Sequence, residues 1–327
     1  MKIIDDDIKN KAFKPVYLIY GEEGYLVNQY RKKLIQAIAG ENTFNLTVVN
    51  EKPDIKELQS LADTPPFMAE KRLIVLDRCS LFKMGKDALD IYADFVKNIP
   101  DHLCLVIAEE SADKRYGLYK AAAGKGHVCE IKTQSQANVT AFITNWFRSE
   151  GKGIDKNAAN EIYERAIGDL GIISGELEKL LAYTSGRDVI TIGDVKALCS
   201  VRVESHVFDM VDAIACKDKG KTYRLYFDLL AVKESPMKIL ILLERHFAQL
   251  FQVSKSPRMP AGELAKTIGM KGVPPFVAGK LLKQVAAFTP ERLKEITESF
   301  AETEEDIKTG RMTDRTGTEL MIAEALL

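Results

Sequence analysis

Short apolar runs alternate with helical patterns over the first 130 residues of the chain. The runs are mostly continuous in apolar character, which is expected of strands that are buried on both faces of a sheet. The expected strands are Val16–Tyr20, Leu46–Val49, Leu73–Leu76, Leu103–Ala108 and Val128–Ile131, and the expected crossover helices are Leu26–Ala39, Ile55–Ala62 and Asp87–Val96. This order of elements predicts a parallel α/β sheet.

After Gln134 the strand pattern stops, and we expect only helices. Apolar residues now recur with the period of an α-helix. They are Val139, Phe142, Ile143, Trp146 and Phe147 in one segment, Ile162, Tyr163 and Ala166 in the next, and Ile173, Leu177, Leu180 and Leu181 in a third. Thr191, with Asp194 three residues later, predicts a capped short helix that runs through Leu198.

From Phe208 onward the pattern is helical again. Ser235-Pro236 and Thr289-Pro290 each combine an N-cap residue with a proline at the first helical position, where the missing N–H costs nothing. Turn-forming residues crowd the connecting segments: Pro257, Pro260, Gly262, Gly269, Gly272, Pro274 and Pro275. The sequence therefore predicts three domains, an α/β domain over residues 1–137, a small helical domain over 138–207 and an all-helical domain over 208–327.

Composition and charge exclude several classes of protein. The formal net charge of -1 argues against a protein that is held to nucleic acid by bulk positive charge. The cysteines are scattered and form no CxxC pair, so we expect reduced thiols rather than a zinc or redox site. The chain starts without an apolar stretch of signal-peptide length, and its most apolar run, Ile239–Leu243, is too short to span a bilayer. We expect a cytoplasmic protein with no membrane association.

The turn after the first expected strand lies where a phosphate-binding loop would lie. A working loop needs glycines, a lysine for the β- and γ-phosphates and a Ser or Thr for magnesium. Gly21-Glu22-Glu23-Gly24 lacks the lysine and the hydroxyl and places two carboxylates there instead. We interpret it as a vestigial loop, and we expect no cofactor. Asp77, at the end of the Arg72–Asp77 run, resembles a magnesium ligand, but we favour a turn or capping role because Arg78 follows it.

Two basic clusters are candidates for phosphate or partner contacts. Asp113-Lys114-Arg115 follows the fourth expected strand, and its simpler interpretation is a surface cluster that opens the next helix. Lys308 and Arg311, with Arg315 nearby, are candidate DNA contacts near the C-terminus. The four histidines are isolated from other ligand types, so we expect structural roles for them and no metal site.

Thr64-Pro65-Pro66-Phe67-Met68 is the most unusual local feature of the sequence. The two prolines end the preceding helix and force an extended backbone. Phe67 and Met68 then follow on an expected surface connection, just before the third strand. Large apolar residues on such a loop are either tucked beneath it or presented to a partner. Both alternatives remain open from the sequence.

Several segments, taken in order, resemble the delta subunit of the bacterial replicative clamp loader. They are VYLIYGEEGYLVNQYRKKL, LADTPPFMAEKRLIVLD, DKRYGLYKAAAGKG, ESPMKILILLERHFAQLF, GVPPFVAGKLLKQVAAFTPERLKEI and EEDIKTG. The resemblance implies a RecA-like (AAA+-type) domain that has lost its ATP chemistry, then a small helical lid and an all-helical collar. It also implies that the protein has no catalytic site and that it binds and opens the ring-shaped sliding clamp.

The resemblance places an apolar clamp-binding element at Pro66, Phe67 and Met68. Pro66 stands where the family often has leucine. The implied partners are the sliding clamp (beta subunit), the motor (gamma/tau) and delta-prime subunits of the clamp loader, and primed DNA within the complex. Two other functions remain as alternatives, an active ATPase of the same fold and a helical nucleic-acid-binding protein. The first needs the missing lysine, and the second needs an excess of basic residues.

Overall fold

The computed structural model describes every residue except 41–42, 256–263 and 265–274. Residues Met1–Thr133 form one compact unit and residues Gln134–Leu327 form a second. The prolines and glycines between 257 and 274 that the sequence assigned to a connecting segment lie outside the described residues.

A five-stranded parallel sheet forms the centre of the first unit, which confirms the predicted α/β class. Its strands are β1 (Val16–Tyr20), β2 (Leu46–Val49), β3 (Arg72–Asp77), β4 (Leu103–Glu109) and β5 (Gly126–Glu130). Their order across the sheet is β2-β3-β4-β1-β5, and every pairing is parallel. Parallel strands need crossover connections, so the helices between them lie on the faces of the sheet.

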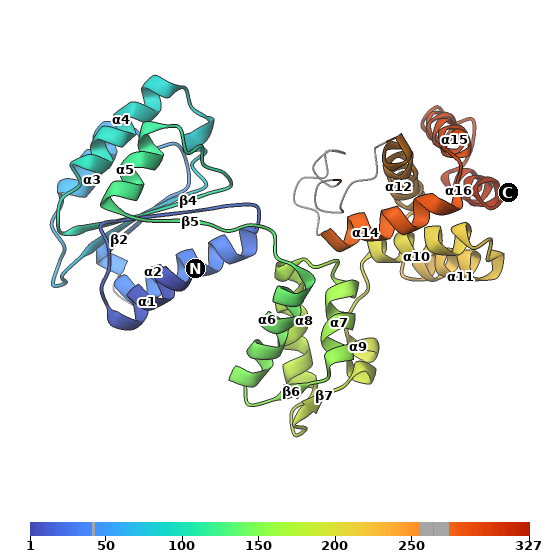
Figure 1. The fold of residues 1–327 in the computed structure, drawn as a ribbon, viewed down its shortest axis with the longest axis horizontal. Helices are drawn as coiled ribbons and strands as arrows, with labels where there is room; N and C mark the ends of the chain where they lie inside the picture. The colour runs from blue at the N-terminus through green and yellow to red at the C-terminus, as the bar shows by residue number, and fades with distance from the viewer. Residues whose placement is uncertain (41–42, 256–263, 265–274) are drawn as a thin grey trace. The chain divides into compact units, whose positions relative to one another are not determined.

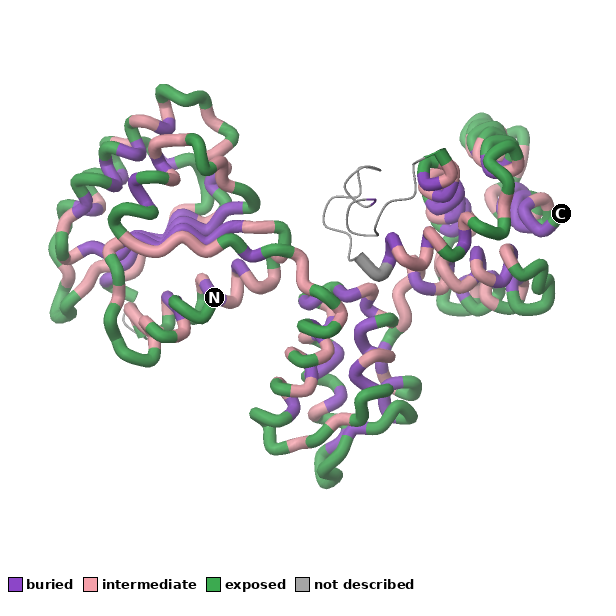
Figure 2. The backbone as a smooth tube through the Cα atoms, in the orientation of Figure 1, coloured by how far each residue is buried: buried purple, intermediate pink, exposed green. Residues whose placement is uncertain are grey.

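Helices cover both faces of this sheet (Figure 1). One face packs against α1 (Lys2–Asn10) and α2 (Gly24–Ile38), and the other against α3 (Ile55–Asp63), α4 (Lys86–Lys97) and α5 (Gly117–Lys125). Two single turns of 3₁₀ helix, η1 (Thr43–Asn45) and η2 (Leu81–Lys83), complete the unit. Figure 2 shows the central strands β1, β3 and β4 as the most buried part of this unit, which explains their apolar sequences. The outer strands β2 and β5 are only partly buried, so the expectation of burial on both faces was wrong for these two.

The helix α1 was not predicted from the sequence. Its acidic run carries structural contacts to aromatic side chains of the first unit. Asp7 Oδ2 accepts a hydrogen bond from the Tyr17 hydroxyl at 2.8 Å, and Asp5 Oδ2 accepts one from the Tyr30 hydroxyl at 2.8 Å. Ile4 is buried against the sheet. The run therefore anchors the N-terminal helix rather than forming a free acidic tail.

The second unit is helical, and its predicted helix starts are confirmed. Its helices are α6 (Gln136–Ser149), α7 (Lys156–Arg165), α8 (Leu170–Tyr183), α9 (Ile192–Leu198), α10 (Val203–Ala215), α11 (Lys219–Ala231), α12 (Pro236–Lys255), α14 (Pro275–Gln284), α15 (Pro290–Lys308) and α16 (Asp314–Ala325), with the 3₁₀ turn η3 (Val285–Ala287). Thr191 and Asp194 form a capping box at α9. Ser235 and Thr289 accept hydrogen bonds from the first turns of α12 and α15.

The prediction that strands end after Gln134 was wrong in one place. Two-residue strands β6 (Gly153–Ile154) and β7 (Val189–Ile190) pair in parallel beside the α6–α9 helices. Strands this short carry no readable periodicity. The residues of α10 to α16 share a separate apolar core from Val207 to Leu326. A division into lid and collar stays a prediction, and α6 and α10 begin a few residues before the two predicted boundaries.

Within the described part of the chain, no helix has both the length and the apolar character needed to cross a bilayer.

A buried polar network connects three helices of the second unit. The Gln284 amide nitrogen donates to Phe208 O at 3.1 Å and to Asp212 Oδ1 at 2.6 Å. Its oxygen therefore faces His246 Nε2 at 2.6 Å, so this ring nitrogen carries the proton. Burial lowers the pKa of His246 to about 4, although the neighbouring Asp212 carboxylate acts in the opposite direction. His246 is thus held as a neutral hydrogen-bond donor.

This network predicts an acid-sensitive second unit. The pKa of His246 is about 4 in the folded protein against an ordinary value of 6.5. Above pH 6.5 the imidazole is neutral in both the folded and the unfolded chain, so protonation costs the folded state no stability there. Stability is lost as the pH falls from there toward about 4, at up to about 1.4 kcal/mol per pH unit. Urea unfolding at several pH values should show a smaller acid loss for His246→Asn than for the wild type. Equal losses in the two proteins would contradict the assignment.

Candidate functional site

The loop between α3 and β3 carries the apolar residues that the sequence singled out. The helix stops at Asp63, and Thr64 has extended backbone angles before the two prolines. Phe67 is 62% exposed and Met68 is 88% exposed, while Pro66 is half-buried. The loop therefore presents its large apolar side chains to solvent, as contact with a partner requires. The structure places all three candidate residues, Pro66, Phe67 and Met68, on this one loop.

Asn45 holds the backbone of this loop in place. Its side chain is almost completely buried, at 2% exposure. The Asn45 amide nitrogen donates to Phe67 O at 2.8 Å, and the Asn45 amide oxygen accepts from Phe67 N at 2.6 Å. One side chain thus satisfies both backbone groups of the exposed phenylalanine. Sequence reasoning missed Asn45, since nothing local relates it to a residue 22 positions away.

Phe44 adds a second exposed aromatic ring beside Phe67. Phe44 is 79% exposed, and the two ring centroids lie 6.2 Å apart at an interplanar angle of 64°. This is an edge-to-face arrangement, which aromatic pairs favour. We call Phe44, Phe67 and Met68 the apolar patch. Met68 has a φ of 50°, in the left-handed region that non-glycine residues seldom adopt.

Both ends of the loop are fastened to the sheet. His102 Nε2 lies 3.0 Å from Ala62 O, close to the end of α3. Lys71 Nζ donates to Asp101 O at 2.6 Å, and Arg72 N donates to His102 O at 2.8 Å. The segment before β4 therefore supports the loop on either side of the apolar patch.

The turn after β1 cannot act as an ordinary phosphate-binding loop. Only residues 21–23 separate β1 from α2, and two residues separate Gly21 from Gly24, whereas the P-loop motif has four between its glycines. Gly21 has a φ of 148°, and a Cβ there would lie 1.9 Å from Ile131 O, so the turn presses against the segment after β5. Glu22 Oε2 accepts a hydrogen bond from Thr133 Oγ1 at 2.9 Å.

Asp77 is bound by an arginine of the same unit. Arg31 Nη1 on α2 lies 2.5 Å from Asp77 Oδ2, and Arg31 Nη2 donates to Asn28 Oδ1 at 2.6 Å. Arg78 Nε lies 3.6 Å from the other carboxylate oxygen. The predicted turn or capping role of Asp77 needs correction, because the carboxylate forms an ion pair between β3 and α2. A guanidinium occupies the position near the strand end where a metal would be needed.

The cluster before α5 is a surface cluster. Arg115 and Asp113 form a bidentate pair, with Arg115 Nη2 at 2.7 Å from Asp113 Oδ2. Hydrogen bonds from Arg115 lower the pKa of the Asp113 carboxyl to about 2. Lys114 Nζ lies 2.9 Å from Glu130 Oε2. Both cations are therefore already paired with carboxylates, and a phosphate would have to displace these partners in order to bind.

The candidate DNA contacts near the C-terminus are also matched by carboxylates. Lys308 Nζ lies 2.8 Å from Glu304 Oε1 on α15, and Arg311 Nε lies 2.8 Å from Asp306 Oδ1. Arg315 pairs with Glu319 on α16. Exposed pairs of this kind exchange partners readily, so a contact with a DNA backbone at Lys308 and Arg311 stays a prediction.

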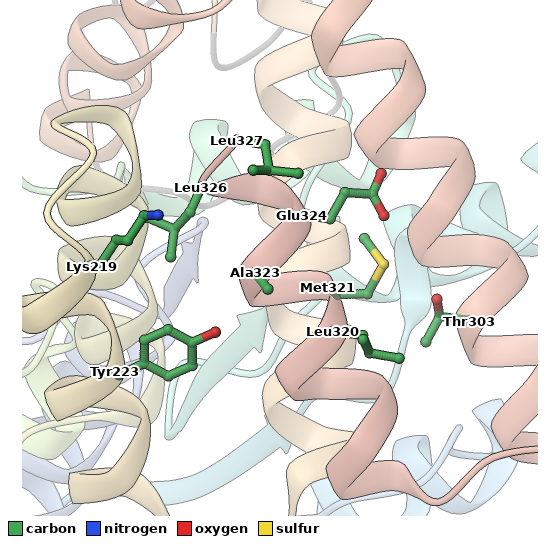
Figure 3. Close-up of a pocket in the computed structure, with 9 residues that line it drawn as sticks. All are labelled: Lys219, Tyr223, Thr303, Leu320, Met321, Ala323, Glu324, Leu326 and Leu327. Carbon is green, nitrogen blue, oxygen red and sulfur yellow. The ribbon is translucent and has the colours of Figure 1, made fainter.

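An open cleft lies between α11, α15 and the end of α16 (Figure 3). Its volume is about 510 Å³. It is lined by Lys219, Tyr223, Thr303, Leu320, Met321, Ala323, Glu324, Leu326 and Leu327. Leu320 and Leu327 are exposed at its edge. The helices thus leave apolar side chains uncovered in the part of the chain that the sequence predicts to be the collar.

The parallel five-stranded sheet and the helices that follow it define the class of AAA+-type proteins to which clamp-loader subunits belong. The fold matches a solved structure of a DNA clamp loader delta protein from Bacillus subtilis, with a TM-score of 0.79 and 25% identity over 99% of each chain. Residues 17–132 match the family model for the DNA polymerase III delta subunit, and residues 204–325 match the model for its C-terminal domain. The chain belongs to the DNA polymerase III delta subunit family.

Curated relatives agree with this assignment. The chain is 27% identical over 331 aligned residues to DNA polymerase III subunit delta of Bacillus subtilis, and the alignment covers 98% of this chain and 95% of that protein. It is 22% identical over 249 residues to a probable DNA polymerase III subunit delta of Aquifex aeolicus, covering 73% and 71%.

The geometry around Gly21 and Asp77 predicts that the protein does not bind Mg-ATP. Isothermal titration of the wild type should give no binding heat, because Arg31 neutralises Asp77 and the turn has no lysine for the phosphates. Arg31→Ala should also give none, since releasing Asp77 does not supply that lysine. Micromolar Mg-ATP binding that disappears in Asp77→Asn would contradict this prediction.

Proposed function

We propose that this delta subunit binds the sliding clamp through Phe67 and Met68, with Pro66 beside them, and opens one interface of the ring for loading onto primed DNA. The observation that carries the proposal is the exposure of Phe67 and Met68 on a loop whose backbone is hydrogen-bonded to a buried side chain. Family membership supports the clamp as the partner, because the related Bacillus subtilis protein is a DNA clamp loader delta protein.

Two physical effects make the loop suitable as an anchor. Burying an exposed phenylalanine in an apolar pocket contributes about 2–3 kcal/mol. Pro65 and Pro66 restrict the unbound loop, so less conformational entropy is lost when it docks. Proline at position 66, where the family often has leucine, shifts the apolar contact toward Phe67 and Met68.

In this proposal ATP is handled by sister subunits, and the chain has no catalytic site of its own. The short turn after β1 and the Arg31–Asp77 ion pair support that division of labour. The alternative of an active ATPase would need a lysine and a metal ligand that the described site does not offer. The chain would act mechanically, and the motor (gamma/tau) subunits would supply the energy.

We further propose that the helices from α10 to α16 form a collar that assembles with the motor and delta-prime subunits. The exposed Leu320 and Leu327 beside the cleft of Figure 3 support this role. Apolar groups of this kind are typical of the centre of a subunit interface. The residues of α6–α9 would form the lid between the two larger domains of the sequence.

A stand-alone nucleic-acid-binding function has weaker support. It would require a basic surface, but Lys308 and Arg311 are matched by Glu304 and Asp306. In our proposal these two cations contact primed DNA only as part of the assembled complex. A net charge of -1 fits this secondary role.

The clamp-binding role predicts the behaviour of Phe67→Ala and of Phe67→Ala/Met68→Ala. Affinity for the sliding clamp, measured without nucleotide, should fall by roughly thirtyfold or more, since a central aromatic anchor is lost. The melting temperature should barely change, because Phe67 is largely exposed. Phe95→Ala is the matched control: this residue of α4 has a buried side chain, and its loss should cost about 3–5 kcal/mol of stability.

The opposite pattern would overturn the proposal. If Phe67→Ala melts much earlier than the wild type and its folded fraction still binds the clamp normally, then Phe67 is a core residue in solution. The clamp-binding surface would then lie elsewhere on the chain.

The collar role predicts that Leu320→Asp weakens assembly with the motor subunits without unfolding the protein. The side chain is 52% exposed, so a carboxylate is tolerated in the isolated chain but not inside an apolar interface. Gel filtration of the mixed subunits should show reduced co-elution. Val189→Asp, an exposed apolar residue of β7, is the control that should co-elute normally. Normal co-elution of both variants would exclude this face as the contact.

A further inference from the structure

We propose that Phe44 and Asn45, which lie outside the predicted clamp-binding motif, complete the clamp-binding site. Asn45 acts as a positioning residue that fixes the backbone of Phe67, and Phe44 acts as a second aromatic anchor in the same apolar pocket of the clamp. The inference rests on the proposed function and deepens it. It concerns residues of a separate segment, which approaches the loop only in the folded chain.

The first observation is the paired hydrogen bond between Asn45 and Phe67. The amide group engages both Phe67 N and Phe67 O, at 2.6 Å and 2.8 Å, as a neighbouring strand would. Because the Asn45 side chain is buried, its amide is costly to leave unpaired, which favours keeping both bonds. A loop without helix or strand is thereby fixed at the residue that carries the exposed ring.

The second observation is the backbone strain at Met68, immediately after the residue that Asn45 holds, Phe67. Met68 lies in the left-handed region with φ 50°, which costs a non-glycine residue free energy. A free loop would relax such a residue unless its neighbours determined the backbone. Asn45 on one side and the Lys71–Asp101 contact on the other supply that restraint. The conformation that presents Phe67 and Met68 is therefore set before the partner arrives.

The third observation is the continuity of the apolar patch. Phe44 and Asn45 are adjacent in η1, so the residue that fixes Phe67 also places a second ring beside it. The two rings meet edge to face and both remain largely exposed. Two exposed phenylalanines in contact have little value for a monomer in water but suit insertion into one apolar pocket. Their contact argues for one shared pocket rather than two separate ones.

A double-mutant cycle with the full chain and the sliding clamp tests the positioning role. Asn45→Ala alone should weaken clamp binding by about tenfold, since the loop must then be ordered during docking. In the Phe67→Ala background the same change should weaken binding by less than about twofold, because Asn45 acts through Phe67. Equal losses in both backgrounds would show a general structural effect, and no loss in either would remove the role; each result overturns the inference.

A measurement without the clamp tests the same restraint. The Phe67 amide should exchange slowly with solvent in the wild type although its side chain is exposed, and rapidly in Asn45→Ala. Fast exchange in the wild type would overturn the positioning role, and this result would not depend on whether the protein binds the clamp.

Phe44→Ala tests the second anchor. It should weaken clamp binding by about tenfold with little change in melting temperature. Ile3→Ala, an exposed apolar residue of α1, is the matched control and should bind within about twofold of the wild type. If Phe44→Ala behaves like Ile3→Ala, the second anchor is wrong. Failure of the proposed function is distinct, because Phe67→Ala itself would then bind like the wild type.

Discussion

The first unit depends on one constraint, the need of a parallel sheet to have both of its faces covered. Parallel strands require a crossover after each strand. Every connection into a strand therefore lies where the strands begin, which we call the amino edge of the sheet. Every connection out of a strand lies where the strands end, which we call the carboxyl edge. The turn after β1 and the end of β3 lie at the carboxyl edge. The segments that lead into β2 and β3 lie at the amino edge. Because β2 and β3 are neighbours, η1 and the loop that carries Phe67 are brought together.

The two edges of this sheet have different chemistry. At the carboxyl edge, where this class of fold places its nucleotide, the turn after β1 is short, and the Asp77 carboxylate at the end of β3 is already paired with Arg31. At the amino edge, a buried amide and an exposed loop hold two aromatic rings toward solvent. In the proposed function, the fold serves as a rigid support for the apolar patch. Arg31 also pairs the mostly buried Asp77 carboxylate, which would be costly to leave without a partner.

The sequence was sufficient for features that depend on local patterns. The first four expected strands match the observed ones closely because they are mostly continuous apolar runs, whereas the fifth, expected at Val128–Ile131, lies at Gly126–Glu130. The capped helix starts at Thr191 and Thr289 follow from adjacent residues. Phe67 was singled out because two prolines precede large apolar residues on an expected surface connection, but the sequence left open whether its side chain is exposed. The Asn45–Phe67 bonds and the Arg31–Asp77 pair were not predictable, since each joins residues that only the tertiary fold brings together.

The same limit explains the three elements that the sequence analysis missed, α1, β6 and β7. The helix α1 carries few apolar residues, and its aspartates find tyrosine partners on β1 and α2 only after folding. The strands β6 and β7 have two residues each, too few for a periodic pattern. In each case a contact that is distant in sequence determines the local structure.

The central claim is that the amino edge of the sheet, with its preset apolar patch, is the surface that meets the sliding clamp. The most direct test is hydrogen exchange of the full chain with and without the clamp, in the absence of nucleotide. The account predicts that the clamp slows exchange in residues 43–45 and 64–71 and leaves the turn at residues 21–24 unchanged. Protection at residues 21–24 with no change in residues 43–45 and 64–71 would contradict it.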